Sequence, residues 1–318
     1  MYNDIKLEKG MYNLSGKNFT SVLEELDPSA AYIGTDLEPL DAFERQLKRY
    51  NIKVNGENCD RVEKFFNTTD TAVLFPEYVK RCISKGFDET VLSSVTAAQT
   101  ICESSQYLGC TMIDNAEYET TAQAASFPVA DVREGTTAVS LEKFGRVINA
   151  SYEAIRKQRL EVFGVMLRSI GVKLALSVVR KAMAVLARDA QSITVSSLTY
   201  SSLAELYGSF DCFDMTTIIA NPAAASVIAA MEQLSDTRKD ADGKLILPFG
   251  SELVKTSAVD ENIIIGIDRN YALEFITSSG LVLETDKLID RQLDQITVSI
   301  SCGFRKIIPE AVKKITIS

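Results

Sequence analysis

Hydrophobic positions in the middle of the chain recur at spacings of three and four residues, which predicts a long helix over residues 151–190. They form one helical stripe: Phe163, Leu167, Ile170, Leu174, Val178, Ala182 and Val185. One face of this helix is therefore expected to be buried. Gly164 and Gly171 each weaken a helix interior by about 1 kcal/mol relative to alanine. We therefore expect either one helix bent near Gly171 or two collinear pieces.

Shorter amphipathic helices are predicted near the N-terminus, over residues 18–26 and 40–50, with a stop at Asp27-Pro28-Ser29 between them. Helices of this length are marginal in isolation. They need a packing partner, which is either the rest of this chain or another copy of it. Denser apolar patterning starts at residues 74–83, where the main body of the fold is expected to begin.

A long polar stretch follows, over residues 96–140, and it is rich in Thr, Ala, Ser, Gln and Glu. No lysine occurs between Lys85 and Lys143. Few large apolar side chains are available to build a core here, so the stretch is either a flexible linker or a protruding loop or hairpin. Val129, Val132 and Val139 give it strand character and favour the protrusion.

The last third of the chain has the patterns of strands. A helix is expected first, because Asn221 is a good N-cap and Pro222 suits the first helical position, and a turn is expected at residues 240–243. Strands are then predicted over residues 263–267, 271–277, 281–284 and 296–304, the last with strict alternation of apolar and polar positions. The fold class is therefore α+β.

Charge is distributed unevenly along the chain. Its formal net charge is −9, which argues against a surface that binds nucleic acid throughout. The predicted long helix is nevertheless basic, with Arg156, Lys157, Arg159, Arg168, Lys173, Arg180, Lys181 and Arg188. These side chains form either a solvated face or a lumenal face near nucleic acid.

Composition disfavours export, membrane insertion and common catalytic chemistry. With 318 residues, 46% hydrophobic and 24% charged, the chain resembles a soluble globular protein, and it starts with no secretory pattern. We expect Arg168, Lys173, Arg180 and Lys181 to interrupt the most apolar stretch, so no membrane partner is expected. The six cysteines are expected to be buried, reduced thiols, and no zinc site or other cofactor is predicted.

The absence of histidine removes Ser-His-Asp and Cys-His nucleophile systems, and no phosphate-binding GxGxxG or GxxxxGK motif occurs. Carboxylate pairs such as Glu24 with Glu25 and Asp286 with Asp290 are typical of solvated charges. An enzyme is therefore not expected.

Six segments, in order, resemble the major capsid protein family of tailed phages, in a branch found in phages and prophages of low-GC Gram-positive bacteria. They are LDAFERQLKRYNIKV (40–54), VEKFF (62–66), TAVLFPEYV (71–79), ASYEAIRKQRL (150–160), IIIGIDRNYALE (263–274) and DKLIDRQL (286–293). The resemblance implies the Hong Kong 97-type capsid fold.

That resemblance implies a division of the chain. Residues 1–72 would be an N-terminal arm and residues 97–145 an extended loop. Residues 73–96, 146–194 and 280–304 would form a peripheral domain with a spine helix at 151–190. Residues 195–279 and 305–318 would form an axial domain.

The function implied by the resemblance is that of a major capsid protein. Copies would self-assemble into hexamers and pentamers of an icosahedral head enclosing double-stranded DNA, in a virion assembled in the bacterial cytoplasm. Expected partners are a separate scaffolding protein, a portal, possible decoration proteins and DNA held by weak non-specific contacts. Because the extended loop has no lysine, the isopeptide crosslink of some relatives is not expected. The alternatives are an encapsulin-like shell around protein cargo and, from another class, a soluble histidine-free enzyme.

Candidate contact residues follow from the same resemblance. Intersubunit contact is predicted for Phe43 and Arg45 of the arm and for Tyr107, Tyr118, Phe127, Arg133 and Glu134 of the extended loop. Each could instead be internal packing or solvated surface. Arg156, Arg159 and Lys173 are predicted to lie near DNA in the lumen.

Overall fold

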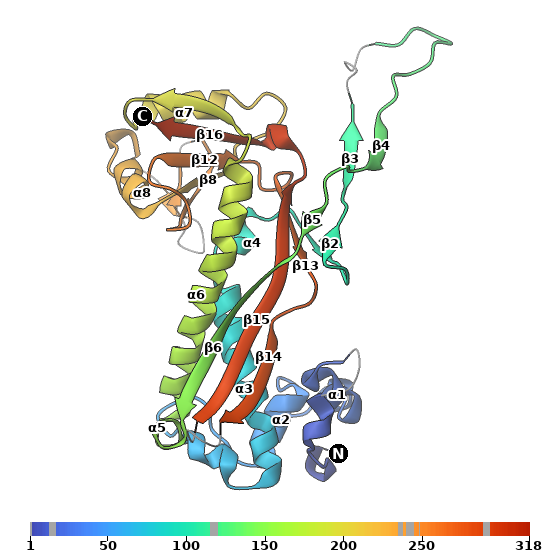
Figure 1. The fold of residues 1–318 in the computed structure, drawn as a ribbon, viewed down its shortest axis with the longest axis vertical. Coiled ribbons are helices and arrows are strands. Elements are labelled where there is room, and N and C mark those ends of the chain that lie inside the picture. Colours follow the sequence, from blue (N-terminus) through green and yellow to red (C-terminus); the bar gives the residue numbers. More distant parts are fainter. Residues whose placement is uncertain are drawn as a thin grey trace. The chain divides into compact units, whose positions relative to one another are not determined.

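The computed structural model describes residues 2–12, 17–114, 120–234, 238–239, 245–247, 249–288 and 293–318. The chain forms two compact units (Figure 1). The first consists of Met1–Thr90, Gly145–Ala175 and Leu281–Ser299, and the second of Val91–Phe144, Leu176–Gly280 and Ile300–Ser318. Helix α6 (Leu160–Ala187) and strand β15 (Leu293–Lys306) each contribute residues to both units.

The first unit begins with short helices: η1 (Tyr2–Asp4), η2 (Lys9–Tyr12), α1 (Phe19–Leu26), η3 (Ser29–Tyr32), α2 (Ala42–Arg49) and η4 (Val62–Phe66). Both predicted N-terminal helices are confirmed. Asn18 caps α1 by accepting from the backbone of Ser21, and Asp41 forms a capping box with Glu44 at the start of α2.

A buried arginine joins these short helices. The Arg45 side chain on α2 is fully buried, and its Nε donates to Asp27 Oδ2 at 2.5 Å. Its remaining nitrogens donate to the main-chain oxygens of Asp27 and Leu40, at 2.5 and 2.6 Å, and to Ser29 Oγ. The Tyr32 hydroxyl donates to the other Asp27 oxygen at 2.6 Å. Because both charges are paired and bonded, they can be held away from water.

Helix α3 (Thr69–Asp88) supports this N-terminal segment and contains the apolar patterning predicted to open the main body. The Tyr12 hydroxyl donates to the Val73 carbonyl at 2.7 Å, and Thr20 donates to Glu77 at 2.6 Å. Arg81 pairs with both Glu77 and Asp41. The short helices therefore find their packing partner within their own chain.

The predicted spine helix is interrupted near its start, and not near Gly171. It consists of α5 (Tyr152–Arg156) and α6. Between them the Val62 amide donates to Gln158 O at 2.9 Å, and the Leu160 amide donates to Asp60 O at 2.8 Å. The backbone at 158–160 therefore bonds to residues 60–62 in place of continuing the helix.

The helix glycines serve close packing. A Cβ added at Gly171 would lie 2.0 Å from Ile83 O on α3, and one added at Gly86 would lie 2.0 Å from Arg168 O on α6. Neither position has room for a side chain. Helix α6 runs unbroken through Gly171, so the expectation of two pieces divided there is wrong. The absence of a side chain at this position lets α3 and α6 approach closely.

One sheet has the strand order β1 (Ala98–Ile101), β13 (Leu273–Thr277), β15, β14 (Val282–Leu288), and β6 (Glu142–Ser151) also pairs with β15. In the first unit β14 is antiparallel to residues 293–299 of β15. In the second unit β13 is antiparallel to residues 302–306 and parallel to β1. The predicted alternation is confirmed, with the apolar set buried: Ile296, Val298, Ile300, Cys302 and Phe304.

The second unit contains a further sheet, in the order β7 (Gln191–Val195), β16 (Val312–Ile317), β12 (Ile263–Ile267), β8 (Thr217–Ala220), β11 (Glu252–Lys255), β10 (Leu245–Ile246), β9 (Arg238–Lys239). Helices α7 (Tyr200–Gly208) and α8 (Pro222–Ala229) share its core, which includes Leu203, Leu206, Ile218, Ile228 and Ile264. Asn221 caps α8 as predicted. The turn predicted at 240–243 lies outside the described residues. Short helices α4 (Leu92–Val95), η5 (Glu232–Leu234) and η6 (Pro309–Ala311) complete the elements.

Two expectations about side chains need correction. Helix α6 is long and apolar enough to cross a membrane by length and composition, with a mean hydropathy of 1.8, so its charges do not interrupt it. Leu167, Leu174 and Leu186 of this helix are buried in the fold. The cysteines are free but not uniformly buried: Cys302 is buried, whereas Cys110 and Cys212 are exposed.

Candidate assembly surface

The polar stretch forms an extended loop, residues 102–141, between β1 and β6 (Figure 1). Strand β2 (Gln106–Tyr107) pairs with β5 (Val139–Ser140), and β3 (Cys110–Ile113) pairs with β4 (Asp131–Glu134), both antiparallel. The prediction of a protruding hairpin is confirmed. Among the described residues, β3 and β4 have no hydrophobic core beneath them, since their residues are exposed or half-buried.

The ribbon of β3 and β4 has two different faces. Met112 lies opposite Val132 and Cys110 opposite Glu134, whereas Thr111 lies opposite Arg133 and Ile113 opposite Asp131. Because successive side chains of a strand point to opposite faces, the first two pairs share one face. Met112 and Val132 are 60% and 69% exposed at its centre. We call the face of Cys110, Met112, Val132 and Glu134 the apolar ribbon face.

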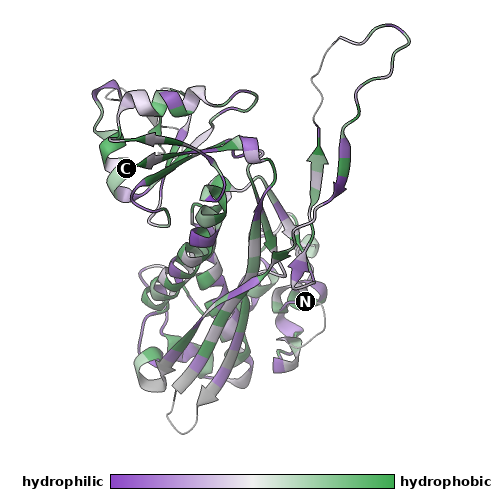
Figure 2. Cartoon of the chain, turned by 45° about the horizontal axis from the view of Figure 1, so that its top comes forward, coloured by the Kyte–Doolittle hydropathy of each residue, from purple (hydrophilic) through white to green (hydrophobic). Residues whose placement is uncertain are grey.

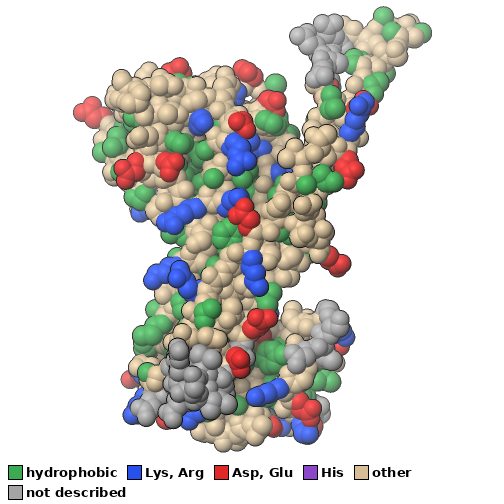
Figure 3. Space-filling view, viewed as in Figure 1, with side chains coloured by type: hydrophobic (Ala, Val, Ile, Leu, Met, Phe, Trp, Pro, Cys, Tyr) green, Lys and Arg blue, Asp and Glu red, His purple; other side chains and the backbone are tan. Residues whose placement is uncertain are grey.

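Other large apolar side chains of the loop also face solvent. Phe127 is 77% exposed, and the exposed set comprises Leu108, Met112, Ile113, Phe127, Val129 and Val132. Figure 2 shows hydrophobic positions along the ribbon and the loop beyond it, and Figure 3 shows hydrophobic side chains on their surface. An isolated two-stranded hairpin is marginal in water, and contiguous exposed apolar surface marks interaction sites. The loop therefore has the properties of a surface that is completed by a partner.

The charges of the loop contribute little to holding it in place. Arg133 Nη2 pairs with Asp131 Oδ2 at 2.6 Å, but both side chains are about half exposed or more. An exposed ion pair contributes about 0–1 kcal/mol. Glu134 is exposed at the edge of the apolar ribbon face. The loop has no lysine, so most of the charged residues that accompany its apolar side chains are acidic.

The predicted loop contacts separate into two groups. Phe127, Arg133 and Glu134 are exposed and remain available for contact. Tyr107 is half-buried at the base of the loop, where its hydroxyl donates to Glu274 at 2.9 Å. Burial and this bond to a carboxylate raise the pKa of Tyr107. Tyr118 lies outside the described residues.

Sequence reasoning missed Met112 and Val132 as contact candidates. The valines were used only as a sign of strand character, and Met112 was not singled out. An apolar residue in a polar stretch was the available signal. The choice of face needed the strand register, which pairs Met112 with Val132.

The arm residues predicted to contact another copy are inside the chain. Phe43 is 2% exposed beneath the Arg81 guanidinium, 4.4 Å from its ring centre, and Arg45 is fully buried. The expectation of intersubunit contact is therefore wrong for both residues. Asp27 pairs with Arg45, and α3 covers Phe43, so neither side chain is available to a neighbouring subunit. We omit Phe43 and Arg45 from the candidate surface.

The predicted lumenal residues lie on α5, α6 and the turn between them. Arg156 stacks over the Phe66 ring at 5.2 Å. Arg159 donates to the carbonyl oxygens of Gly56 and Glu57, at 3.1 and 2.8 Å, and to Cys59 Sγ. Arg159 thus ties a nearby loop to the start of α6. Arg156, Arg159 and Lys173 are all exposed, so their guanidinium and ammonium groups can also reach an anionic partner.

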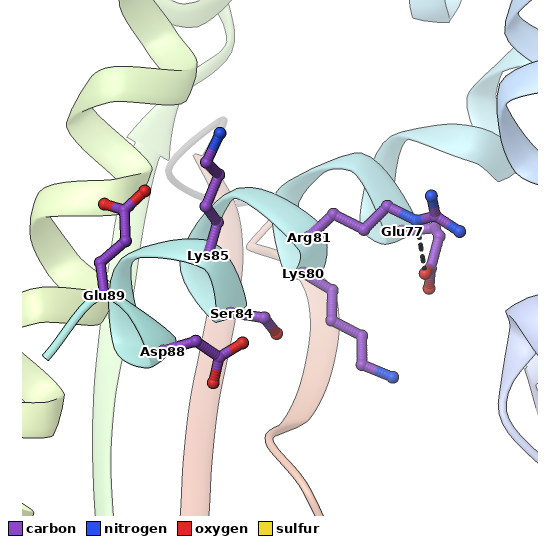
Figure 4. A pocket seen from close by; sticks show the side chains of 7 residues that line it. All are labelled: Glu77, Lys80, Arg81, Ser84, Lys85, Asp88 and Glu89. Atoms are coloured by element: carbon purple, nitrogen blue, oxygen red, sulfur yellow. Dashed lines mark hydrogen bonds and ion pairs between the residues drawn. The ribbon is translucent and has the colours of Figure 1, made fainter. Parts of the chain in front are cut away.

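A hollow of 530 Å³ lies along α3 and is lined by Glu77, Lys80, Arg81, Ser84, Lys85, Asp88 and Glu89 (Figure 4). Its side chains point outward in different directions, and the Glu77–Arg81 ion pair is the contact drawn between them. They do not converge on a point where a reacting atom would sit. Among the described residues, no cluster of three or more metal-ligating side chains is found.

Several solved structures are similar to this chain. The virus-like particle from Pyrococcus furiosus matches with a TM-score of 0.51 and 12% identity, covering 75% of this chain and 98% of that one. The capsid of Cyanophage P-SCSP1u matches with 0.51 and 11%, covering 72% and 88%. The SrpI encapsulin of Synechococcus elongatus matches with 0.53 and 13%, covering 71% and 89%. No protein-family model and no curated protein matches the sequence.

These likenesses show the fold. The chain has the Hong Kong 97-type capsid fold, which phage capsid subunits and an encapsulin share in these structures.

Proposed function

We propose that this chain is the major capsid protein of a tailed phage or prophage, the subunit that self-assembles into the hexamers and pentamers of an icosahedral head around double-stranded DNA. The observation that carries the proposal is the extended loop, with its exposed apolar ribbon face, on a fold shared with shell proteins. Six ordered segments of the sequence resemble tailed-phage capsid proteins and favour that branch.

Assembly supplies what the loop lacks in one copy. Each subunit would lay its apolar ribbon face on another copy, so Met112, Val132 and Phe127 would leave water. Closed shells need contacts that repeat around rings, and these join different patches of two identical subunits. Many modest contacts of this kind sum to a stable assembly.

The remaining roles follow from the proposed division of the chain. Residues 97–145 would be the extended loop, residues 195–279 and 305–318 the axial domain, and α6 the spine of the peripheral domain. A separate scaffolding protein, a portal and decoration proteins would be its partners in the virion. Arg156, Arg159 and Lys173 would meet packaged DNA by weak, non-specific contacts.

A second candidate is an encapsulin-like shell around protein cargo, favoured by the likeness to the SrpI encapsulin. The two candidates make the same kind of shell and differ in its contents. Both candidates are non-enzymatic. The lack of histidine favours this, and so does the hollow on α3, whose side chains do not point toward a common site.

Electron microscopy of the purified full chain, with intact mass on the same sample, tests the proposal. Closed shells or capsomer rings at unmodified mass are expected. The ratio of absorbance at 260 and 280 nm, before and after nuclease, then distinguishes DNA from protein contents. A uniform monomer that persists with crowding agents and a co-expressed scaffold would refute a shell subunit.

The contact face has its own matched test. Met112→Ser with Val132→Ser removes the centre of the apolar ribbon face and is expected to prevent shell formation. Ile113→Ser, on the opposite face of the same strand, is the control and should still assemble. If both variants fail equally to form shells, the contact does not depend on the apolar ribbon face.

A further inference from the structure

The root of the extended loop is joined to the sheet by two charged side chains and one hydroxyl on three neighbouring strands. Glu274 on β13 lies directly opposite Arg305 on β15 and opposite Ala98 on β1. Thr100 is two residues beyond Ala98, so it belongs to the same face of β1. The three side chains therefore gather on one face of the sheet, where the loop begins.

The Glu274 carboxylate is the centre of this group and is only 5% exposed. Its Oε2 accepts from Arg305 Nε at 2.5 Å. Its Oε1 accepts from the Tyr107 hydroxyl at 2.9 Å and from Thr100 Oγ1 at 2.5 Å. One buried carboxylate thus binds donors from β15, β1 and β2, the last being part of the loop.

Arg305 also forms a hydrogen bond with the backbone of the loop. Its Nη1 donates to the Cys110 carbonyl at 2.9 Å, at the first residue of β3. A Cβ on Gly109 would lie 2.1 Å from Arg305 Cζ, so a glycine is required for this approach. The Gly109 carbonyl in turn accepts from the Gly135 amide at 2.7 Å, which ties in the returning strand.

The charged state of Glu274 supports this arrangement. Burial raises the pKa of the carboxyl, but the hydrogen bonds from Thr100, Arg305 and Tyr107 outweigh burial and leave the pKa below its ordinary value. The group is therefore ionised at neutral pH. Hydrogen bonds to a charged acceptor are the stronger kind, so these directed bonds hold the root to the sheet.

We propose that Glu274 and Arg305 are positioning residues that fix the direction in which the extended loop leaves the sheet, so that its apolar ribbon face meets a second copy of this chain. The pair acts through Tyr107, Gly109 and Cys110, and touches no partner itself. The consequence for assembly rests on the proposed shell function, whereas the hold on the loop root does not.

Hydrogen exchange of the full chain tests the hold directly. Reporter amides at the root are Cys102, which donates to Thr277 O, Gly135, and Leu141, which donates to Ser105 O. In Glu274→Gln these amides should exchange at least about tenfold faster, and by a larger factor than the amides of β12 and β16. Glu252→Gln, which alters the ion pair with Arg269 in the same unit, is the control and should leave the root protected. Unchanged exchange at the root in Glu274→Gln would overturn the proposal.

Two further variants separate positioning from general stability. Glu274→Leu with Arg305→Leu removes both charges together and leaves neither unpaired, so the unit should stay folded while the root loosens. Tyr107→Phe removes one hydroxyl and keeps the ring, and should loosen the root less than Glu274→Gln. A double variant whose root exchanges like the wild type would overturn the proposal even if Glu274→Gln failed to fold.

Shell formation then distinguishes the two levels. If the wild type forms shells and the loosened double variant forms none or shells of altered size, positioning is supported. If the loosened variant forms the same shells at the same yield, the loop direction does not depend on the pair. If the wild type forms no shells while the root still loosens, the proposed function fails and the hold on the root stands.

Discussion

The N-terminal segment and the extended loop both lie outside the two larger sheets, yet only the N-terminal segment is folded onto the rest of its chain. The short helices of residues 2–66 are folded onto α3 around a fully buried arginine. The described part of the extended loop is anchored at its root, and beyond the root Met112, Phe127 and Val132 face solvent. Both excursions use an arginine Nε to carboxylate contact of 2.5 Å, Arg45 with Asp27 and Arg305 with Glu274.

The difference lies in what surrounds the two pairs. Helices α1 and α2 contact each other and bury apolar side chains such as Phe19 and Phe43, so the ion pair of Arg45 belongs to a packed segment. Around Arg305, only the root is packed, and the ribbon continues without support. A buried ion pair can therefore fix where an excursion starts, but apolar packing decides whether the rest of it folds back.

The largest effect is expected for Arg45→Met. It leaves the Asp27 carboxylate buried without its partner, which costs about 3–5 kcal/mol of unfolding free energy. Urea unfolding and protease cleavage within residues 17–66 measure it. Arg133→Met is the matched control in the loop, where an exposed pair contributes about 0–1 kcal/mol. Equal losses in both variants would erase the contrast between the two regions.

Glu274→Gln should show the next largest effect, and it depends on pH. Because the folded pKa of Glu274 is lowered, its charge contributes stability above the ordinary value of 4.5, and this is lost as the pH falls through the folded pKa. The variant should be about 1.5–3 kcal/mol less stable at neutral pH. The gap should close in acid, since a protonated carboxyl is neutral like an amide. Unfolding curves of both proteins from pH 7 to pH 3 check this, and a constant gap would contradict it.

Gly171→Ala tests the support beneath the N-terminal segment. The methyl group would collide with the Ile83 carbonyl of α3, so overpacking should cost about 1–3 kcal/mol. This opposes the gain of about 1 kcal/mol that alanine brings to a helix interior. Thermal unfolding measures the net loss. Gly208→Ala, where no atom lies within 4 Å, should be neutral or slightly stabilising.

The smallest effect on stability is expected on the ribbon. Met112→Ser with Val132→Ser should change the free energy of unfolding of the isolated chain by no more than about 0.5 kcal/mol, because both side chains are already in water. Urea unfolding under conditions that prevent assembly provides the comparison. A loss like that of Arg45→Met would mean that the ribbon packs within its own chain.

Features with local signals could be predicted from the sequence. Asn18 and Asn221 identified the starts of α1 and α8, and the alternation over residues 296–304 identified the buried face of β15. The absence of lysine and large apolar runs identified the extended loop.

Features set by residues far apart in the chain could not be predicted. The interruption before α6 arises because residues 158–160 bond to residues 60–62, about a hundred positions away. From the sequence alone, Gly171 suggested a weak point in the helix. The structure shows that a side chain is excluded there because a carbonyl group of α3 lies too close. The sequence suggested an intersubunit contact for Arg45, whereas its hydrogen-bond partners Asp27 and Leu40 lie in its own chain. The apolar ribbon face likewise needed a strand register.

The two helix glycines also restrict how this sequence can change in length. On α3, Gly86 follows by three residues Ile83, whose carbonyl faces Gly171. On α6, Gly171 follows by three residues Arg168, whose carbonyl faces Gly86. One inserted residue between either pair would turn the following helix by about 100° and move a bulky side chain into the crossing. Homologues should therefore keep both spacings, whereas residues 120–126 of the loop, which precede the proposed contact Phe127, should accept insertions.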